Sequence, residues 1–203
     1  MAAGILVLAL DLGDAPAPDS SAWFASERVP DIGNGARLLS CERWTDCVNP
    51  KRAVLTYEFD QLGSGEPGAP ASGRAAGLEL AMAGCCTVLH FEGELIAPAA
   101  GPMPQRARGL LINAMSVDPD VEVDFNTWYD QEHLPALSAV PGALCARRFR
   151  SRAGSPRYLA IYHLDSPAVQ ASPQWKRAAN TPWTERMRPH FLDHVRIVAE
   201  AAR

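Results

Sequence analysis

The sequence predicts an α+β protein built from two copies of one unit, joined in tandem and packed sheet to sheet. The first observation behind this prediction is an internal repeat, because adding 105 to a residue number from Gly4 to Asp60 gives its counterpart without a gap. For example, RAVLTYEFD at 52–60 meets RYLAIYHLD at 157–165. The second observation is that both copies show strand and helix patterns in one order, and the third is that their strands are apolar on both faces.

The second copy shows its first elements most clearly. The apolar run Leu110–Val117 has the length of a strand. Asp124 is a suitable N-cap for a helix from Phe125 to about Ala136, and Pro141-Gly142 predicts the turn that follows. The copy therefore begins with a strand and a helix.

Four further elements complete this copy. Strands over 144–150 and 158–164, joined by the turn AGSP at 153–156, form a predicted hairpin. A second helix is expected between 166 and 188, and HVRIVAE at 194–200 gives the last strand. The order β-α-β-β-α-β is that of a ferredoxin-like unit.

The domain limits follow from the repeat. Residues 1–97 form the first ferredoxin-like repeat, with its last strand at 87–95, and 98–108 form the linker. Residues 109–203 form the second repeat. The first copy is the degenerate one, since its segment 61–76 is a loop rich in Gly, Pro and Ser, so we expect it to be structural and the second to hold the pocket.

Composition excludes several classes of function. The net charge of −4 and the absence of a run of like charges argue against nucleic acid as a partner. The run GILVLAL is too short to cross a membrane, and no charged segment precedes it as in a secretory signal. We therefore expect a soluble, cytoplasmic protein. The five cysteines, Cys85 and Cys86 among them, are an odd number and predict reduced thiols of open role.

The sequence carries no common cofactor motif and one pair of histidines with a metal-like spacing. The chain has no P-loop, no G-x-G-x-x-G after a strand and no G-x-S-x-G elbow, so no cofactor is expected. His190 and His194 have the spacing of a helical metal pair, but they cross from a helix end into a strand. We therefore expect no metal site there.

The motifs W-Y-x-x-E-H-L-P, V-P-G and A-R-R-F of the second copy resemble those of the dimeric α/β-barrel superfamily, and within it the EthD-like and muconolactone-isomerase-like proteins. In that superfamily two ferredoxin-like units usually pair as separate chains, with pockets between sheet and helices. The resemblance implies that this chain supplies both units. It does not select a reaction, because the superfamily includes isomerases, lyases, cyclases, cofactor-free monooxygenases and haem enzymes.

Glu132 and His133 differ in how they repeat. Helical spacing places Glu132 near the middle of the predicted buried sector and His133 on its flank; the sector holds Phe125, Trp128, Tyr129, Glu132 and Ala136. Glu27 repeats the carboxylate in the first copy, whereas Arg28 replaces the histidine. We therefore interpret Glu132 and Glu27 as structural and His133 as catalytic, a role that the resemblance also implies.

Substrate-binding residues are expected around this histidine. Asn113 is polar in an apolar strand where the first copy has Leu8. The segment 172–191 has no counterpart, and its Trp175, Trp183 and Phe191 could wall a flat ligand, with a cation from Lys176, Arg186 or Arg188. The full predicted set is Asn113, Trp128, Arg148, Tyr162, Trp175 and Trp183.

The leading hypothesis is a cofactor-independent isomerase, lyase or cyclase in which His133 moves a proton on an apolar, aromatic or lactone substrate. An unperturbed histidine would have a pKa of roughly 6 to 7. One alternative is a non-catalytic binding or structural barrel. Another is a cofactor-free monooxygenase acting on an electron-rich phenol. A cavity of roughly 300 Å³ or more beside His133 would favour a ligand site over a filled barrel. The expected partner is a small molecule, and homo-oligomerisation stays open.

Overall fold

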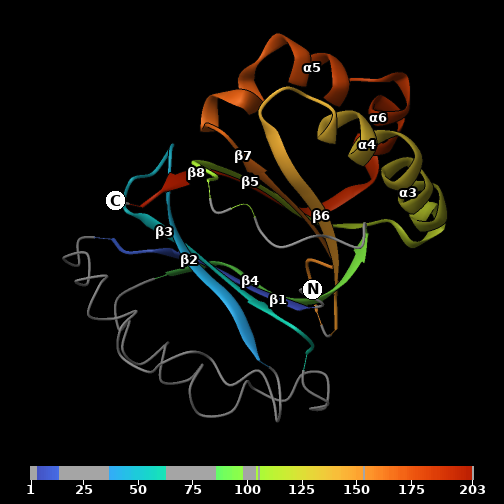
Figure 1. Cartoon of the computed structure of the whole chain (residues 1–203). Coiled ribbons are helices and arrows are strands. Elements are labelled where there is room, and N and C mark those ends of the chain that lie inside the picture. Colours follow the sequence, from blue (N-terminus) through green and yellow to red (C-terminus); the bar gives the residue numbers. More distant parts are fainter. Residues whose placement is uncertain are drawn as a thin grey trace.

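The computed structural model describes residues 4–13, 37–62, 86–97, 104, 106–152 and 154–202. The strands of these residues form one closed antiparallel barrel (Figure 1). Those of the first half are β1 (Gly4–Asp11), β2 (Leu38–Asp46), β3 (Arg52–Phe59) and β4 (Cys86–Ala97). Those of the second half are β5 (Gly109–Val117), β6 (Ala143–Ser151), β7 (Tyr158–Leu164) and β8 (Phe191–Ala201).

Each half has the strand order of a ferredoxin-like sheet. The orders are β4-β1-β3-β2 and β8-β5-β7-β6, which are the same when strands are counted within each half. The edge strand β2 pairs with β8, and β6 pairs with β4, so the two sheets share hydrogen bonds at both seams. The predicted tandem of ferredoxin-like repeats, packed as an intramolecular α/β barrel, is confirmed.

The duplication extends further than the sequence comparison did. Ile5 pairs with Glu58 just as Leu110 pairs with His163, which keeps the offset of 105 through the third strands. On their other sides, Ile5 pairs with Gly93 and Leu110 pairs with Ala199, which gives 199 − 93 = 106 for the fourth strands. One extra residue before β8 therefore hid the relation of the last strands.

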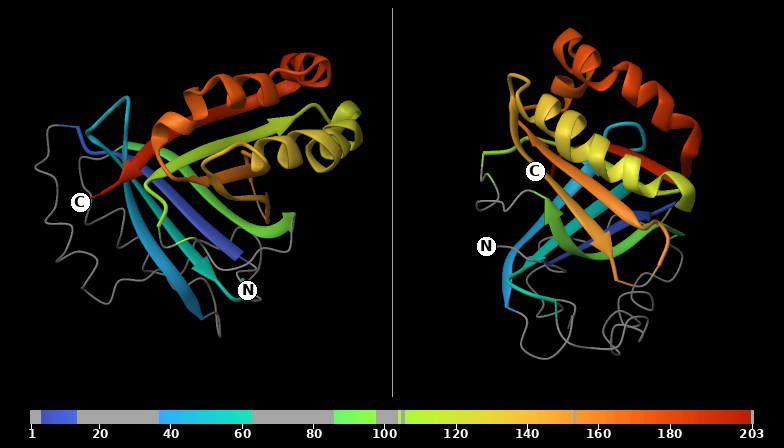
Figure 2. Two further views of the ribbon diagram at one scale, coloured as in Figure 1. Left: turned by 45° about the horizontal axis from the view of Figure 1, so that its top comes forward. Right: turned by 90° about the vertical axis from the view of Figure 1, so that its right-hand side faces the viewer.

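The two faces of the second sheet have different neighbours. Its inner face packs against the first sheet, and Leu110, Ile112 and Ile161 belong to the apolar core shared by both halves. Its outer face lies under helices, as both views of Figure 2 show. These helical segments are η1 (Pro119–Val121), α3 (Glu122–Trp128), η2 (Tyr129–His133), α4 (Leu134–Ser138), η3 (Pro167–Ala171), α5 (Pro173–Ala179), α6 (Pro182–Met187) and η4 (Arg188–His190).

The first helix of this layer begins earlier than predicted. Pro119 opens the short helical turn η1, which runs directly into α3, and Val121 is the N-cap. Asp124 therefore lies in the first turn and does not cap the helix. Its carboxylate instead accepts a hydrogen bond of 3.2 Å from Trp183 Nε1.

Some predictions fall outside the described residues. They concern Glu27, Arg28, Cys85 and most of the segments 61–76 and 98–108. The cysteines that are described, Cys41, Cys47, Cys86 and Cys145, are free. In the part of the chain that the structure describes, no helix is both long and apolar enough to span a membrane.

Candidate functional site

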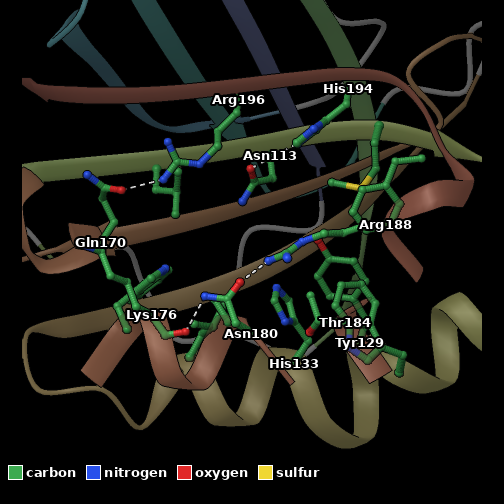
Figure 3. A pocket seen from close by; sticks show the side chains of 17 residues that line it. Asn113, Tyr129, His133, Gln170, Lys176, Asn180, Thr184, Arg188, His194 and Arg196 are labelled. Atoms are coloured by element: carbon green, nitrogen blue, oxygen red, sulfur yellow. Dashed lines mark hydrogen bonds between the residues drawn. The ribbon is translucent and has the colours of Figure 1, made fainter. Parts of the chain in front are cut away.

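A cavity of about 360 Å³ lies between the outer face of the second sheet and its helices (Figure 3). Its apolar wall comes from both layers and consists of Leu111, Met115, Trp128, Leu137, Trp175, Ala179 and Phe191. His133 lines the same cavity. The volume exceeds the roughly 300 Å³ expected of a ligand pocket, so the structure favours a ligand site over a barrel filled by side chains.

A π-helical turn places His133 in this wall. The segment η2 lies between α3 and α4 and ends at His133, two residues before Pro135, which has no N–H to continue the normal hydrogen-bond ladder. The wider turn shifts the buried stripe, and His133 is 8% exposed and stacks on Trp128 with ring centroids 4.2 Å apart. The prediction that Glu132 occupies the middle of the buried sector was wrong, because it assumed regular α-helical spacing.

The environment of His133 keeps its ring neutral. Burial lowers the pKa of His133 to about 3, and the positive charges of Arg148 and Arg188 add to this effect. The pKa of 6 to 7 expected for an unperturbed histidine therefore does not apply to this buried ring. Nδ1 is buried without a hydrogen-bond partner among the described residues, while Nε2 is not among the buried unpartnered atoms. Since a buried N–H without an acceptor costs about 1–3 kcal/mol, the favoured tautomer carries its proton on Nε2.

Three polar residues line the cavity from the strand side. Asn113 on β5 lies beside His194 on β8, with Oδ1 and Nε2 3.5 Å apart. Arg196 follows on the same face of β8 and donates a hydrogen bond of 2.5 Å to Gln170. Figure 3 shows these side chains along the strands, across the cavity from His133.

The helix side supplies two more cations. Lys176 lies on α5, and Arg188, at the start of η4, donates a hydrogen bond to Asn180. Both side chains are exposed, as is Arg196, so the three cations form the rim of the cavity. Thr184, in contrast, is buried in its wall.

The charges around the cavity are all of one sign. Seventeen described residues line it, and none of them is Asp or Glu. None of the three rim cations forms a salt bridge with a carboxylate of the described chain. An apolar interior with an uncompensated cationic rim suits a small molecule that carries an anionic group at one end.

Glu132 has a partner outside the cavity. It accepts a hydrogen bond from Thr181 Oγ1, and the same hydroxyl accepts the N–H of Thr184 as the N-cap of α6. The carboxylate thus links the first helix of the layer to α6. The structural role of Glu132 stays a prediction, and the donor to its carboxylate is a threonine hydroxyl.

Three of the predicted binding residues do not line the cavity. Arg148 is buried against Tyr129, 4.1 Å from its ring centroid, and donates to Asp130 and Asn126. Tyr162 is fully buried and packs edge-on against Trp175. Trp183 turns to Asp124, with Arg186 over its ring. In each case a nearer partner inside the helical layer holds the side chain away from the cavity.

The prediction found part of the lining and missed the rest. Asn113, Trp128, His133 and Trp175 do line the cavity, as do Phe191, Lys176 and Arg188. The missed polar residues are Gln170, Asn180, Thr184, His194 and Arg196. A signal was present for the last two, because alternation along β8 places them on the face opposite the core residues Ile197 and Ala199.

The two histidines with metal-like spacing have separate neighbours. His190 Nδ1 lies 2.9 Å from Asp118, whereas His194 faces the cavity. No group of three or more His, Cys, Asp or Glu side chains suited to a metal ion occurs among the described residues.

Comparison with known proteins yields a likeness of fold alone. No family model matches the chain, and no curated protein matches it. Among solved structures, a monooxygenase-like protein from Listeria innocua superposes with a TM-score of 0.57 and 8% identity, covering 100% of this chain and 95% of that one. A ferredoxin-fold protein from Listeria monocytogenes, related to antibiotic biosynthesis monooxygenases, superposes with a TM-score of 0.55 and 9% identity. The match covers 100% of this chain and 96% of that one. An anthrone oxidase-like protein superposes with a TM-score of 0.59 and 14% identity, covering 98% of this chain and 92% of that one.

At these identities the shared feature is the fold of the dimeric α/β-barrel proteins. The narrower resemblance to EthD-like and muconolactone-isomerase-like proteins stays a prediction.

Proposed function

We propose that the second half is the active half of a cofactor-independent enzyme acting on a small, flat, anionic molecule. The observation that carries this proposal is the cavity lining, which combines an apolar interior with three cations and no carboxylate. In this proposal the ring of an aromatic or lactone substrate lies among the apolar side chains, and its acidic group meets the rim cations Lys176, Arg188 and Arg196.

The role proposed for His133 is that of a neutral hydrogen-bond donor. A histidine with a pKa near 3 is a poor base at neutral pH, but its Nε2–H can stabilise negative charge that develops on a substrate oxygen. Thr184 and Asn113 offer further polar contacts from the helix and strand sides. The site would then favour reactions that pass through an enolate or phenolate.

Two reaction classes share that intermediate. Isomerases and lyases that move a proton next to a carbonyl form an enolate, and this is the class we favour. In this proposal His194 takes up the proton, because it also lines the cavity and burial lowers its pKa, which leaves its ring neutral at pH 7. Cofactor-free oxygenation of an electron-rich phenol is the second candidate, and the fold likeness to monooxygenase-like and anthrone oxidase-like proteins supports testing it. A non-catalytic binding protein would bind the same molecules without turnover.

The first experiment compares matched ligand pairs. Thermal shift and calorimetry should be run with 2-hydroxybenzoate against 2-hydroxybenzamide and with 1-naphthoate against 1-naphthamide, with anthrone and hemin as further probes. We expect each carboxylate to bind more tightly than its neutral amide. Equal affinity within each pair would contradict an anionic substrate.

A matched pair of arginine variants tests the rim. Arg188→Gln should weaken binding of the carboxylates about 3- to 10-fold, because a partly solvated charge pair contributes around 1 kcal/mol. Arg186→Gln is the control, since that guanidinium lies over Trp183 outside the cavity. Compounds that bind are then assayed for turnover with and without O₂, which separates isomerase or lyase chemistry, oxygenation and simple binding.

A further inference from the structure

A buried ion pair inside the barrel joins the two halves. Arg147 on β6 and Glu58 on β3 are 0% and 2% exposed, and the guanidinium donates to both carboxylate oxygens, with 2.8 Å from Nη1 to Oε2. Burial alone would lower the pKa of Arg147, but the hydrogen bond and charge of Glu58 raise it. The pair lies on the face away from the candidate site, so the proposed function does not use it.

The duplication gives this pair a counterpart built from different residues. At the offset of 105, Glu58 corresponds to His163 and Arg147 corresponds to Glu42. The strand registers agree, because Ser40 pairs with Glu58 as Cys145 pairs with His163. The two-fold relation between the halves therefore sets Glu42 and His163 in the positions of an ion pair.

Neither of these two residues is fully charged at pH 7. Burial raises the pKa of Glu42 to about 7, and the negative charge of Glu58 adds to this effect. Burial lowers the pKa of His163 to about 3, and both ring nitrogens lack a partner among the described residues. His163 packs edge-on against Trp44, with ring centroids 6.0 Å apart. The barrel interior thus holds one compensated ion pair beside two groups that are not fully charged.

Like halves could not balance their charges in this way. Two first halves would bring together two copies each of Glu42 and Glu58, which are four carboxylates without a cation. Two second halves would bring together two copies each of Arg147 and His163, with no carboxylate. An uncompensated charge in an apolar interior destabilises strongly, so both like pairings are disfavoured.

We propose that this inner cluster makes the barrel a pairing of unlike halves: the inner face of the second sheet accepts the first half of this chain and rejects a second copy of itself. The cluster, defined as Glu42, Glu58, Arg147 and His163, then lets the chain close its own barrel and prevents its halves from pairing with like halves of other chains. The inner face of the second sheet therefore packs best against a sheet whose own inner face is acidic.

The test makes the two halves alike within full-length chains. The basic chain carries Glu42→Arg and Glu58→His, and the acidic chain carries Arg147→Glu and His163→Glu. We expect each to lose roughly 10 °C or more in Tm, or to stop being monomeric, as for a broken buried ion pair in a chain of this size. Co-expression of the two should give a 1:1 dimer in which every barrel joins a basic half to an acidic half, with Tm largely restored.

Two controls separate pairing from packing. The exchanged chain, with all four substitutions, has complementary halves again and should be monomeric and recover at least half of the lost Tm. The charge-free chain Glu58→Met/Arg147→Met should stay within about 5 °C of the wild type, because an apolar replacement of similar volume is often neutral. The proposal is overturned if the basic and acidic chains are monomeric with wild-type Tm, or if the exchanged or charge-free chain melts as low as they do.

Discussion

The outer faces of the two sheets occupy equivalent positions but differ in chemistry. In the first half, β1 directs Leu6, Leu8 and Leu10 into an apolar cluster. In the second half, the matching positions of β5 are Leu111, Asn113 and Met115, which line the cavity. On the fourth strands, His90 stands where β8 has Arg196, at the offset of 106. Among the described residues, Leu8 of β1 therefore stands where β5 has the cavity residue Asn113.

The inner faces diverged in a complementary way. There the buried cation of the second half meets a carboxylate of the first, whereas the cations around the outer cavity meet none among the described residues. A charge compensated within the fold contributes to assembly, and one left uncompensated at a cavity is available to a ligand. This contrast supports assigning the scaffold role to the first half and the proposed site to the second.

The largest expected effect is that of His133→Phe. This change keeps an aromatic ring stacked on Trp128 but removes the nitrogen that faces the cavity, so we expect a loss of roughly 10² to 10³ in kcat/KM, as for an oxyanion donor. The measurement is steady-state turnover of an identified substrate, with Tm as the control for folding. Full turnover in the variant would assign His133 to packing.

The next effect comes from giving the first half the polar residue of the second. Leu8→Asn places an amide in an apolar cluster and should lower the free energy of unfolding by about 2–4 kcal/mol. Urea denaturation measures it. A loss below about 1 kcal/mol would show that this face also accommodates polar groups, and the asymmetry would fail there.

The reverse exchange, Asn113→Leu, should leave stability nearly unchanged, because the side chain lies against a mostly apolar wall. Binding of 2-hydroxybenzoate should weaken about 3- to 10-fold if the amide contacts the ligand. Calorimetry measures this, with Met115→Leu as the control on the same strand face. Unchanged affinity would remove Asn113 from the proposed contacts.

Glu132→Ala should affect the scaffold more than the site. It removes the carboxylate that accepts a hydrogen bond from Thr181 at the start of α6, so we expect a loss of about 1–2 kcal/mol in unfolding free energy. Thr181→Ser keeps the hydroxyl and is the matched control. A variant of wild-type stability with lost turnover would instead give Glu132 a chemical role.

The smallest expected effect is that of pH on binding. Because the pKa of His133 is about 3, its ring stays neutral between pH 5 and 8.5, and the affinity for 1-naphthoate should be nearly constant over that range. The same lowering affects stability: between the ordinary pKa near 6.5 and the folded value the unfolded state binds more protons, so the contribution of a buried neutral His133 is lost as pH falls below about 6.5. Tighter binding on acidification through pH 6 to 7 that disappears in His133→Phe would show instead that His133, and not the neighbouring His194, titrates in the site.

Strand positions were largely predictable because local patterns determine them. The offset of 105 located three strands of each half, and the hairpin at 144–164 follows from alternation and turn residues. The relation of β4 to β8 was not visible, because one inserted residue breaks the register without changing the burial pattern.

The site was predictable only in part because it depends on side-chain competition. Arg148 and Trp183 have side chains suited to ligand contacts. In the fold, however, Arg148 donates hydrogen bonds to Asp130 and Asn126, and Trp183 donates one to Asp124. The burial of His133 follows from a π-helical turn, which regular helical periodicity cannot indicate. Residue type therefore indicated the candidate binding residues, and side-chain packing determined which of them line the cavity.

The central claim is that a ligand site belongs to the second half alone, and a crystal structure of the full chain with 1-naphthoate tests it most directly. We predict the naphthyl ring between Trp128 and Trp175, with the carboxylate towards Arg188. A ligand found instead on the outer face of the first sheet, beside Leu8 and His90, with the second-half cavity closed by its own side chains, would contradict the account.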